Sequence, residues 1–370
     1  MIKRILRDRR SVAIAVSVIA VVAIVATGLL IVVRPGFTAQ ATATPTAVPS
    51  GSPTPLPSPS PTLEGSPTPI PTDWVYSDLD GLLAPKDSAH RLPMAIMIDD
   101  NIVARPQSGF SSASIVYQAF ADGGEDRYML VFQEGTASDI GPVRSARPYY
   151  VYWAAEYKAA YCHFGGDAES LQHVIPTMAR SIYDMDAITN HCPYRRITTR
   201  VSPHNAYTTS SDVIAGAAAM HYPSTYQNSP VRTFKDDLPL AQRPASQAIS
   251  IPYHTGQVGY TFDPATDSYL RSVDGKLQTD AANGQQVKAR NIVVMFQALS
   301  TLSDGRPFVA NVGSGKATVF LEGQAIGATW KKTSNTALTR LYDSSGAEIQ
   351  LVRGEIFMQS VPISTVVTYR

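Results

Sequence analysis

Short apolar runs separated by polar turns fill the first half of the chain's globular part. Four of them are five to seven residues long, which suits buried strands better than helices. They lie at 94–98, 114–120, 127–132 and 159–164. Two longer segments predict helices, at 148–157 and 211–221, because Pro148 suits a first helical turn and Ser211 is a good N-cap. This alternation predicts an α/β domain over residues 73–223 with a mostly buried sheet.

After residue 223 the pattern changes. Residues 224–247 carry scattered prolines and a charged patch, which predicts a connector. Beyond it, short apolar runs alternate with glycine-bearing turns, as in a mainly β domain of hairpins over residues 248–370. Its expected strands are 258–262, 292–296, 317–321, 325–330, 339–342 and 348–351. The predicted fold class is therefore α+β.

The N-terminus has the pattern of a membrane anchor. An uncharged apolar run at 12–33 follows the basic segment 1–11, and about 20 helical residues cross a bilayer. The positive-inside rule then keeps residues 1–11 in the cytoplasm and places the rest outside, which predicts a single-pass cell-membrane protein. A cleaved signal peptide is the alternative, since Ala39-Gln40-Ala41 resembles a cleavage site, although such apolar regions are ordinarily shorter.

Residues 34–72 consist mostly of Thr, Ala, Ser, Pro and Gly, which predicts a disordered stalk. The chain has 31 basic and 30 acidic residues, of which six basic and one acidic residue lie in the first 34 positions. The remainder therefore carries a net charge of about −4. That balance disfavours nucleic-acid binding by the outer domains, because it lacks the required basic surface.

Two motifs suggest chemistry that their context does not support. Residues 313–316 read Gly-Ser-Gly-Lys, but a phosphate loop also needs Gly five residues earlier and Ser or Thr afterwards, so we expect a tight β-turn. Cys162-His163 and His191-Cys192 have metal-ligand types, yet neighbours on a strand point to opposite faces, so no metal is expected. The two cysteines, the only ones in the chain, form a disulfide or remain free thiols. Neither follows the apolar run, so lipid attachment is not expected.

Polar motifs at strand ends supply the candidate ligand-binding residues. Arg144 and Arg147 precede the helix expected at 148–157, whose free N–H groups and dipole favour an anion. In the alternative interpretation, both arginines pair with acids such as Asp99, Asp100 or Glu125 and brace the loops. The full candidate set is Arg105, Gln107, Arg144, Ser145, Arg147, His163, His204 and Asn205.

Several of these motifs resemble the YerB-like lipoprotein family, whose two domains are classed as a domain of unknown function (number 3048). The resemblance is carried by segments at 92–99, 104–109, 115–117, 141–147 and 203–205, and in the second half by those at 272–276, 312–317 and 327–332. It covers nearly all of residues 78–362. It implies an extracytoplasmic protein at the cell membrane, but no activity. Members are typically lipid-anchored, whereas this chain has no lipidation cysteine.

Three functions fit these observations. The first is a binding module for an anionic ligand, an envelope polymer or a protein partner. The second is a hydrolase or transferase acting on envelope material, with His163 or His204 as general base, Asp99 or Asp100 as its orienting carboxylate and arginines as electrophilic support. The third is a structural envelope protein. No cofactor is expected, and the sequence does not decide whether the protein is an enzyme.

Overall fold

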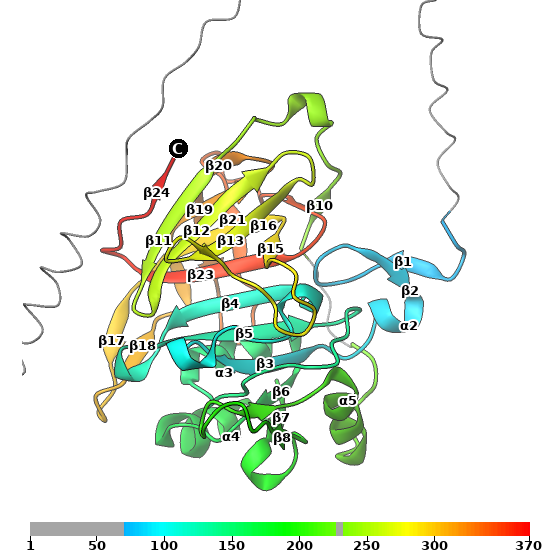
Figure 1. The fold of residues 1–370 in the computed structure, drawn as a ribbon, viewed down its shortest axis with the longest axis vertical. Coiled ribbons are helices and arrows are strands. Elements are labelled where there is room, and N and C mark those ends of the chain that lie inside the picture. Colours follow the sequence, from blue (N-terminus) through cyan, green and yellow to red (C-terminus); the bar gives the residue numbers. More distant parts are fainter. Residues whose placement is uncertain (1–69, 227–231) are drawn as a thin grey trace, which may run out of the picture. The chain divides into compact units, whose positions relative to one another are not determined.

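Ten strands form one mixed sheet, the largest element of this computed structural model, which describes residues 70–226 and 232–370 (Figure 1). The two halves of the chain each supply five neighbouring strands. From edge to edge these are β21 (Arg340–Tyr342), β20 (Gln324–Lys332), β19 (Gly313–Leu321), β16 (Asn291–Gln297), β23 (Ile356–Pro362), β4 (Ile115–Phe120), β5 (Asp126–Phe132), β3 (Met94–Asp99), β6 (Ala160–His163) and β7 (Tyr183–Asp186).

The halves join where β23 pairs in parallel with β4, from Ile356 opposite Ile115 to Gln359 opposite Gln118. All residues of β3, β4 and β5 are buried, as expected for strands covered on both faces. The sequence pattern predicts separate domains at residues 73–223 and 248–370. In the structure, strands from both ranges belong to this one sheet. The described residues of both halves form one compact unit.

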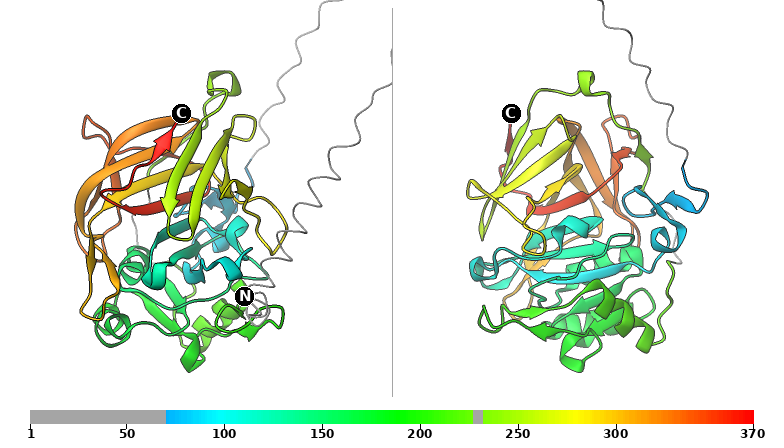
Figure 2. Two further views of the ribbon diagram at one scale, coloured as in Figure 1. Left: turned by 60° about the vertical axis from the view of Figure 1, so that its left-hand side comes forward. Right: turned by 45° about the vertical axis from the view of Figure 1, so that its right-hand side comes forward.

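A second sheet covers part of one face of the first. Its order is β14 (Lys276–Leu277), β13 (Ser268–Val273), β12 (Gly256–Asp263), β11 (Ala248–Tyr253) and β24 (Thr368–Tyr369), with β15 (Lys288–Ala289) also paired to β13. Side chains of β11 and β12 share a core cluster with Ile292 and Phe357 of the large sheet. Both views of Figure 2 keep the strands of this second sheet together at one end of the compact unit.

Small strand pairs complete the sheet structure. They are β1 (Trp74–Tyr76) with β2 (Leu83–Pro85), β8 (Arg195–Arg196) with β9 (Ala206–Tyr207), β10 (Phe234–Lys235) with β22 (Leu351–Val352), and β17 (Leu299–Thr301) with β18 (Pro307–Val309). β10 lies inside the expected connector. The described residues thus form a mixed α+β fold that is mostly sheet and has a β-rich second half, which confirms the predicted class.

The helices are short. They are α2 (Lys86–Ala89), α3 (Pro148–Ala154), α4 (Ile175–Met178) and α5 (Ser210–Ala219), with 3-10 turns at Ile102–Ala104, Phe110–Ser112, Asp122–Gly124, Ala155–Tyr157, Ala187–Thr189 and Leu240–Gln242, and a π-helical turn at Ser170–Val174. Pro148 begins α3 as expected. The N-cap of α5 is Thr209 instead of Ser211, because the Thr209 hydroxyl accepts the N–H of Asp212 at 3.0 Å.

Two expectations for the second half are wrong. Residues 313–316 form the first part of β19 instead of a turn, and the turn falls at Glu322-Gly323, where φ is positive at both residues. Gly315 is needed in the strand, since a Cβ there would lie 2.7 Å from Nε1 of Trp330 on the paired strand. The strand expected at 348–351 is reduced to β22 at Leu351–Val352.

The sulfur atoms of Cys162 and Cys192 are bonded, with their Cα atoms 5.5 Å apart. The bond ties β6 to the loop that leads toward His204. Among the described residues, no helix has the length and apolar character to cross a membrane. The apolar run at 12–33 and nearly all of the expected stalk lie outside the described residues.

Candidate functional site

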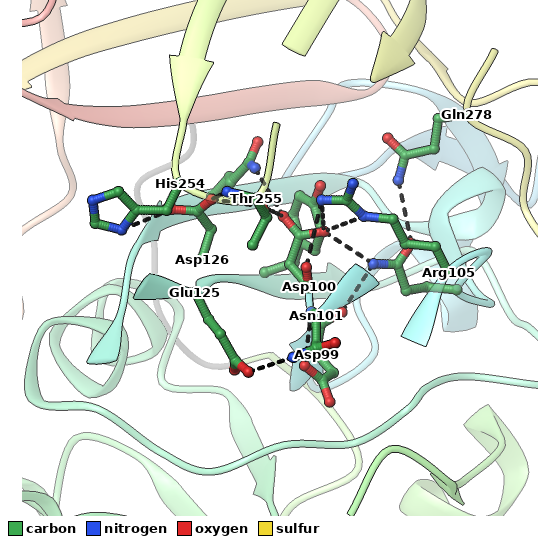
Figure 3. Close-up of polar contacts among 12 residues, drawn as sticks. Asp99, Asp100, Asn101, Arg105, Glu125, Asp126, His254, Thr255 and Gln278 are labelled. Carbon is green, nitrogen blue, oxygen red and sulfur yellow. Dashed lines mark hydrogen bonds and ion pairs between the residues drawn. The ribbon is translucent and has the colours of Figure 1, made fainter. Parts of the chain in front are cut away.

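Two consecutive acids at the end of β3 point to opposite faces of the large sheet. Asp99 is the last residue of β3 and Asp100 follows it, and both side chains are fully buried. Side chains alternate along a strand, so the two carboxylates diverge (Figure 3). The candidate residues therefore separate into two groups, here called the Asp99 cluster and the Asp100 cluster.

The Asp99 cluster consists of Asp99, Arg127, Arg144 and His204. Nδ1 of His204 lies 2.6 Å from Oδ2 of Asp99, and Nε of Arg144 lies 3.2 Å from the same oxygen. The side chains of His204 and Arg144 are 14% and 19% exposed, so both reach the surface above a buried carboxylate. The main-chain N–H of Asn101 donates to the other oxygen of Asp99 at 3.0 Å. Asp99 therefore holds an imidazole and a guanidinium side by side.

Arg127 lies opposite Asp99 in the antiparallel β3–β5 pair, so its side chain lies on the same face. The residue is 2% exposed, and its Nε and Nη1 have no acceptor in the described part of the chain. Only Nη2 approaches acids, at 3.9 Å from Asp122 and 3.7 Å from Glu125. Burial, followed by the neighbouring Arg147 and Arg144, lowers the pKa of Arg127. Three guanidinium groups thus gather at one end of β5, and within the described residues Nε and Nη1 of Arg127 and Nε of Arg144 have no hydrogen-bond partner.

Arg147 lies beside this cluster but is occupied by acids. Its Nε donates to Oδ1 of Asp122 at 2.7 Å and lies 3.5 Å from Oδ2 of Asp167. Burial raises the pKa of Asp122, but Arg147 and then Arg127 outweigh it, so that pKa is lowered overall. Arg147 is buried and fully paired, so its geometry favours a bracing role.

Of the remaining candidates in the first half, His163 contacts other residues, whereas Asn205 and Ser145 are chain neighbours of cluster residues. His163 is fully buried, and its ring nitrogens lie 2.8 Å from the carbonyl oxygen of Gly165 and 2.8 Å from Oδ1 of Asp184. Asn205 shapes the loop beside His204, since its amide donates to the carbonyls of Ile197 and Arg200, both at 3.2 Å. Ser145 is half-buried between Arg144 and Arg147 in the chain.

The Asp100 cluster lies on the face covered by the second sheet. Arg105 donates to Oδ1 of Asp100 through Nε at 3.1 Å and Nη2 at 2.8 Å (Figure 3). Gln107 donates to the same oxygen at 3.2 Å. Oδ2 accepts from Gln118 at 3.2 Å and from the Thr255 hydroxyl at 2.9 Å. Arg105 and Gln107 are therefore separated from Arg144 and His204 by the sheet.

A fully buried arginine from the second half of the chain extends the hydrogen-bond network of the Asp100 cluster. Arg271 donates to the hydroxyls of Tyr260 at 3.0 Å and Tyr128 at 3.1 Å, and to Oε1 of Gln118 at 2.6 Å. Sequence reasoning overlooked Arg127 and Arg271. The available signal was a charged residue inside an otherwise apolar strand, because such a residue is buried only with partners or for function.

The described residues include no group of three or more His, Cys, Asp and Glu side chains that would hold a metal ion. The arginines of the Asp99 cluster can donate hydrogen bonds to an anion, and His204 can transfer a proton. The imidazole Nε2 has no partner within residues 70–226 and 232–370, whereas Nδ1 is bound by Asp99.

These features occur in a fold with known relatives. Residues 79–223 match the "Protein of unknown function (DUF3048) N-terminal domain" and residues 249–358 match the C-terminal domain of the same name. The chain therefore belongs to the DUF3048 family. It is 28% identical over 291 residues to "Putative lipoprotein YerB" of Bacillus subtilis (strain 168), covering 77% of this chain and 85% of that protein. The crystal structure of the B. subtilis YerB protein superposes with a TM-score of 0.70 at 25% identity, over 80% of this chain and 99% of that one.

Proposed function

We propose that this protein binds an anionic ligand at the Asp99 cluster. The observation that carries the proposal is Arg127, a buried guanidinium whose Nε and Nη1 have no acceptor among the described residues. Buried donors are ordinarily satisfied, and leaving one unpaired costs about 1–3 kcal/mol or more for a charged group. An oxyanion beside Arg127 and Arg144 supplies the missing acceptors, because guanidinium forks match carboxylate and phosphate geometry.

Net charge does not drive this binding. Acids surround the three arginines, and the two acids nearest to Arg127 already accept hydrogen bonds from other residues. Asp122 accepts from Arg147, and Glu125 accepts from Asn101. The preference for an anion comes from the unfilled donors of Arg127, together with Nε of Arg144, which approaches Asp99 without the alignment of a hydrogen bond. Affinity is therefore expected to depend on the shape of the anion as well as on its charge.

The proposed location is the outer face of the cell membrane. A lipoprotein relative supports a membrane-associated, extracytoplasmic protein. In this chain the apolar run at 12–33 takes the place of a lipid and leaves residues 73–370 outside. Ligands available there include envelope polymers with phosphate or carboxylate groups.

Replacing Arg144 with glutamine tests the binding site. Phosphate and sulfate should raise the melting temperature of the full chain, by an amount equivalent to about 2.7 kcal/mol at a ligand concentration of one hundred times Kd. Arg144→Gln should lose most of this stabilisation, because it removes the solvent-accessible fork of the cluster. Thermal melts in phosphate, sulfate and chloride at equal ionic strength give the comparison.

Arg180→Gln is the matched control, since Arg180 is exposed and has no ion pair with any described residue. Phosphate and sulfate also stabilise proteins non-specifically, and the control variant keeps that effect. Equal anion-dependent shifts in Arg144→Gln and Arg180→Gln would contradict the proposed site.

A second function, hydrolysis at the same site, is favoured by the His204–Asp99 pair. With Nδ1–H donated to Asp99, Nε2 of His204 is free to take a proton from water, while Arg144 holds the oxyanion that forms. Any esterase activity on bis-p-nitrophenyl phosphate or p-nitrophenyl acetate should fall by about 10²–10⁴ in His204→Gln. The control is His173→Gln, at an exposed histidine. Identical rates in both variants, or none in the wild type, would exclude this function for these substrates.

A further inference from the structure

We propose a second ligand site in the pocket between the loop 102–107 and the β13–β14 hairpin, specific for an amphipathic anion: a phosphate or carboxylate joined to a short aliphatic group. The pocket has a volume of about 310 Å³ and brings together residues from both halves of the chain. The residues that carry the argument are Ile102, Arg105, Gln107, Lys276, Leu277 and Gln278. It lies on the Asp100 face, so it is independent of the Asp99 cluster.

Arg105 supplies a fixed positive group. Asp100 holds Nε and Nη2 of its guanidinium, and Nη1 makes no hydrogen bond to any described residue. The Arg105 side chain is 18% exposed, whereas Asp100 is fully buried beneath it. A guanidinium oriented in this way loses little conformational freedom when it binds an oxyanion. Gln278 of the opposite wall lines the same pocket, and both side chains are drawn in Figure 3.

Lys276 supplies a second positive group from that wall. It follows the two-residue turn Asp274-Gly275, where φ is 50° and 72°, and the turn fixes the position of β14. The carboxylate of Asp274 accepts the main-chain N–H of Gln257 at 2.8 Å, which engages it with the neighbouring turn. Lys276 is exposed and has no ion pair with the described acids, so its charge is available to a ligand.

The floor of the pocket is polar and buried. Gln107 is 0% exposed and donates to Oδ1 of Asp100 at 3.2 Å. Its Oε1 lies 3.5 Å from Nε2 of Gln278, which is the longest contact of the group. The Gln107 amide is held by the main-chain oxygen of Asp99 and by Asp100, and Oε1 of Gln278 accepts from Arg271. Nε2 of Gln278, with only this long contact among the described residues, is the amide donor left for the polar end of a ligand.

The rim of the pocket is apolar and exposed. Ile102 is 73% exposed and Leu277 is 68% exposed, one on each wall. Arg200 braces the loop of Ile102 by donating to the carbonyls of Ala104 at 2.6 Å and Pro106 at 2.7 Å. Large aliphatic side chains held in water beside two cations favour a ligand that covers them while its charge reaches Arg105 and Lys276.

Monobutyl phosphate is the probe. Inorganic phosphate and butanol, which represent its charged and its apolar part, are the comparison ligands. Titration calorimetry uses the full chain carrying Arg144→Gln, in which the Asp99 cluster has lost most of its anion binding. We expect monobutyl phosphate to bind at least tenfold more tightly than inorganic phosphate, and butanol not to bind. Dihexanoyl phosphatidylglycerol is the competitor: displacement assigns a lipid head group as the source of the anion, and failure to displace assigns a free anion.

Lys276→Gln should weaken monobutyl phosphate binding at least tenfold, whereas Lys331→Gln, at an exposed lysine of β20, should not change it. The double variant Ile102→Ser/Leu277→Ser should reduce the affinity to that of inorganic phosphate. All of these side chains are exposed, so the variants should fold. Equal affinities in Lys276→Gln and Lys331→Gln, or no advantage of monobutyl over inorganic phosphate, would overturn this site without affecting the Asp99 cluster.

Discussion

Replacing Lys332 with methionine should lower the free energy of unfolding by about 3–5 kcal/mol, because it leaves the carboxylate of Glu156 buried without its closest positive partner. Nζ of Lys332 lies 3.0 Å from Oε1 of Glu156, and both side chains are 0% exposed. Glu156 also accepts from the N–H of Thr339 at 3.1 Å, while Arg232 lies 3.8 Å away. Urea denaturation of the full chain measures the loss.

This buried network joins the two halves of the chain. Glu156 follows α3, Lys332 ends β20, and Arg232 belongs to the segment expected as a connector. Lys331→Met is the matched control, since Lys331 is the neighbouring residue of the same strand and is exposed. Equal unfolding midpoints for the two variants would show that the ion pair contributes nothing to holding the halves together.

Asp126 should make the protein less stable as the pH rises from about 4 to about 7. Burial, partly offset by the hydrogen bonds from Thr255 and reinforced by Asp100, raises the pKa of Asp126 from 3.8 to about 7. Between those values the folded state binds more protons than the unfolded state, so the free energy of unfolding falls with rising pH. The destabilisation is absent below about pH 4 and complete above about pH 7, where it is on the order of 4 kcal/mol.

Asp126→Asn removes this titration. The Thr255 N–H and hydroxyl donate to Oδ2 of Asp126 at 2.8 and 2.6 Å, and an amide oxygen can keep those bonds. The variant should therefore exceed the wild type in stability at pH 8 and approach it near pH 4. Urea denaturation across this range, with the exposed Asp87→Asn as control, checks the difference. Parallel curves for Asp126→Asn and wild type would contradict it.

Local sequence patterns predicted four of the five strands that the first half supplies to the large sheet, because residues covered on both sheet faces form continuous apolar runs, whereas β7 was missed. Met94–Asp99 is such a run, and the helix after Arg147 was marked by Pro148. The pairing of β23 with β4 was not predictable, since apolar runs do not say which strands become neighbours. For the same reason, the sequence predicted a turn at residues 313–316, although Trp330 on the paired strand explains Gly315.

Three of the four residues of the Asp99 cluster were named from the sequence, but Arg127 and the grouping of the candidates were not predicted. Asp99, Arg144 and His204 were all named from the sequence, and their convergence depends on a loop that returns more than a hundred residues later to β3. Arg105 lies on the opposite face because it binds Asp100, whose side chain points away from that of Asp99. The sequence did not show that β3 ends at Asp99, so it did not show on which face each acid lies. Arg147 forms ion pairs with Asp122 and Asp167, which are not the acids that the sequence analysis named as its partners.

The most direct measurement of the central claim is the position of a bound anion. Crystals of the protein soaked with selenate, whose selenium gives an anomalous signal, should show a peak within about 4 Å of the guanidinium groups of Arg127 and Arg144 and near Nε2 of His204. The peak should disappear in Arg144→Gln and persist in Arg180→Gln. An Asp99 cluster occupied by water alone at saturating selenate, in a wild-type crystal whose Arg144 is free of lattice contacts, would contradict the account.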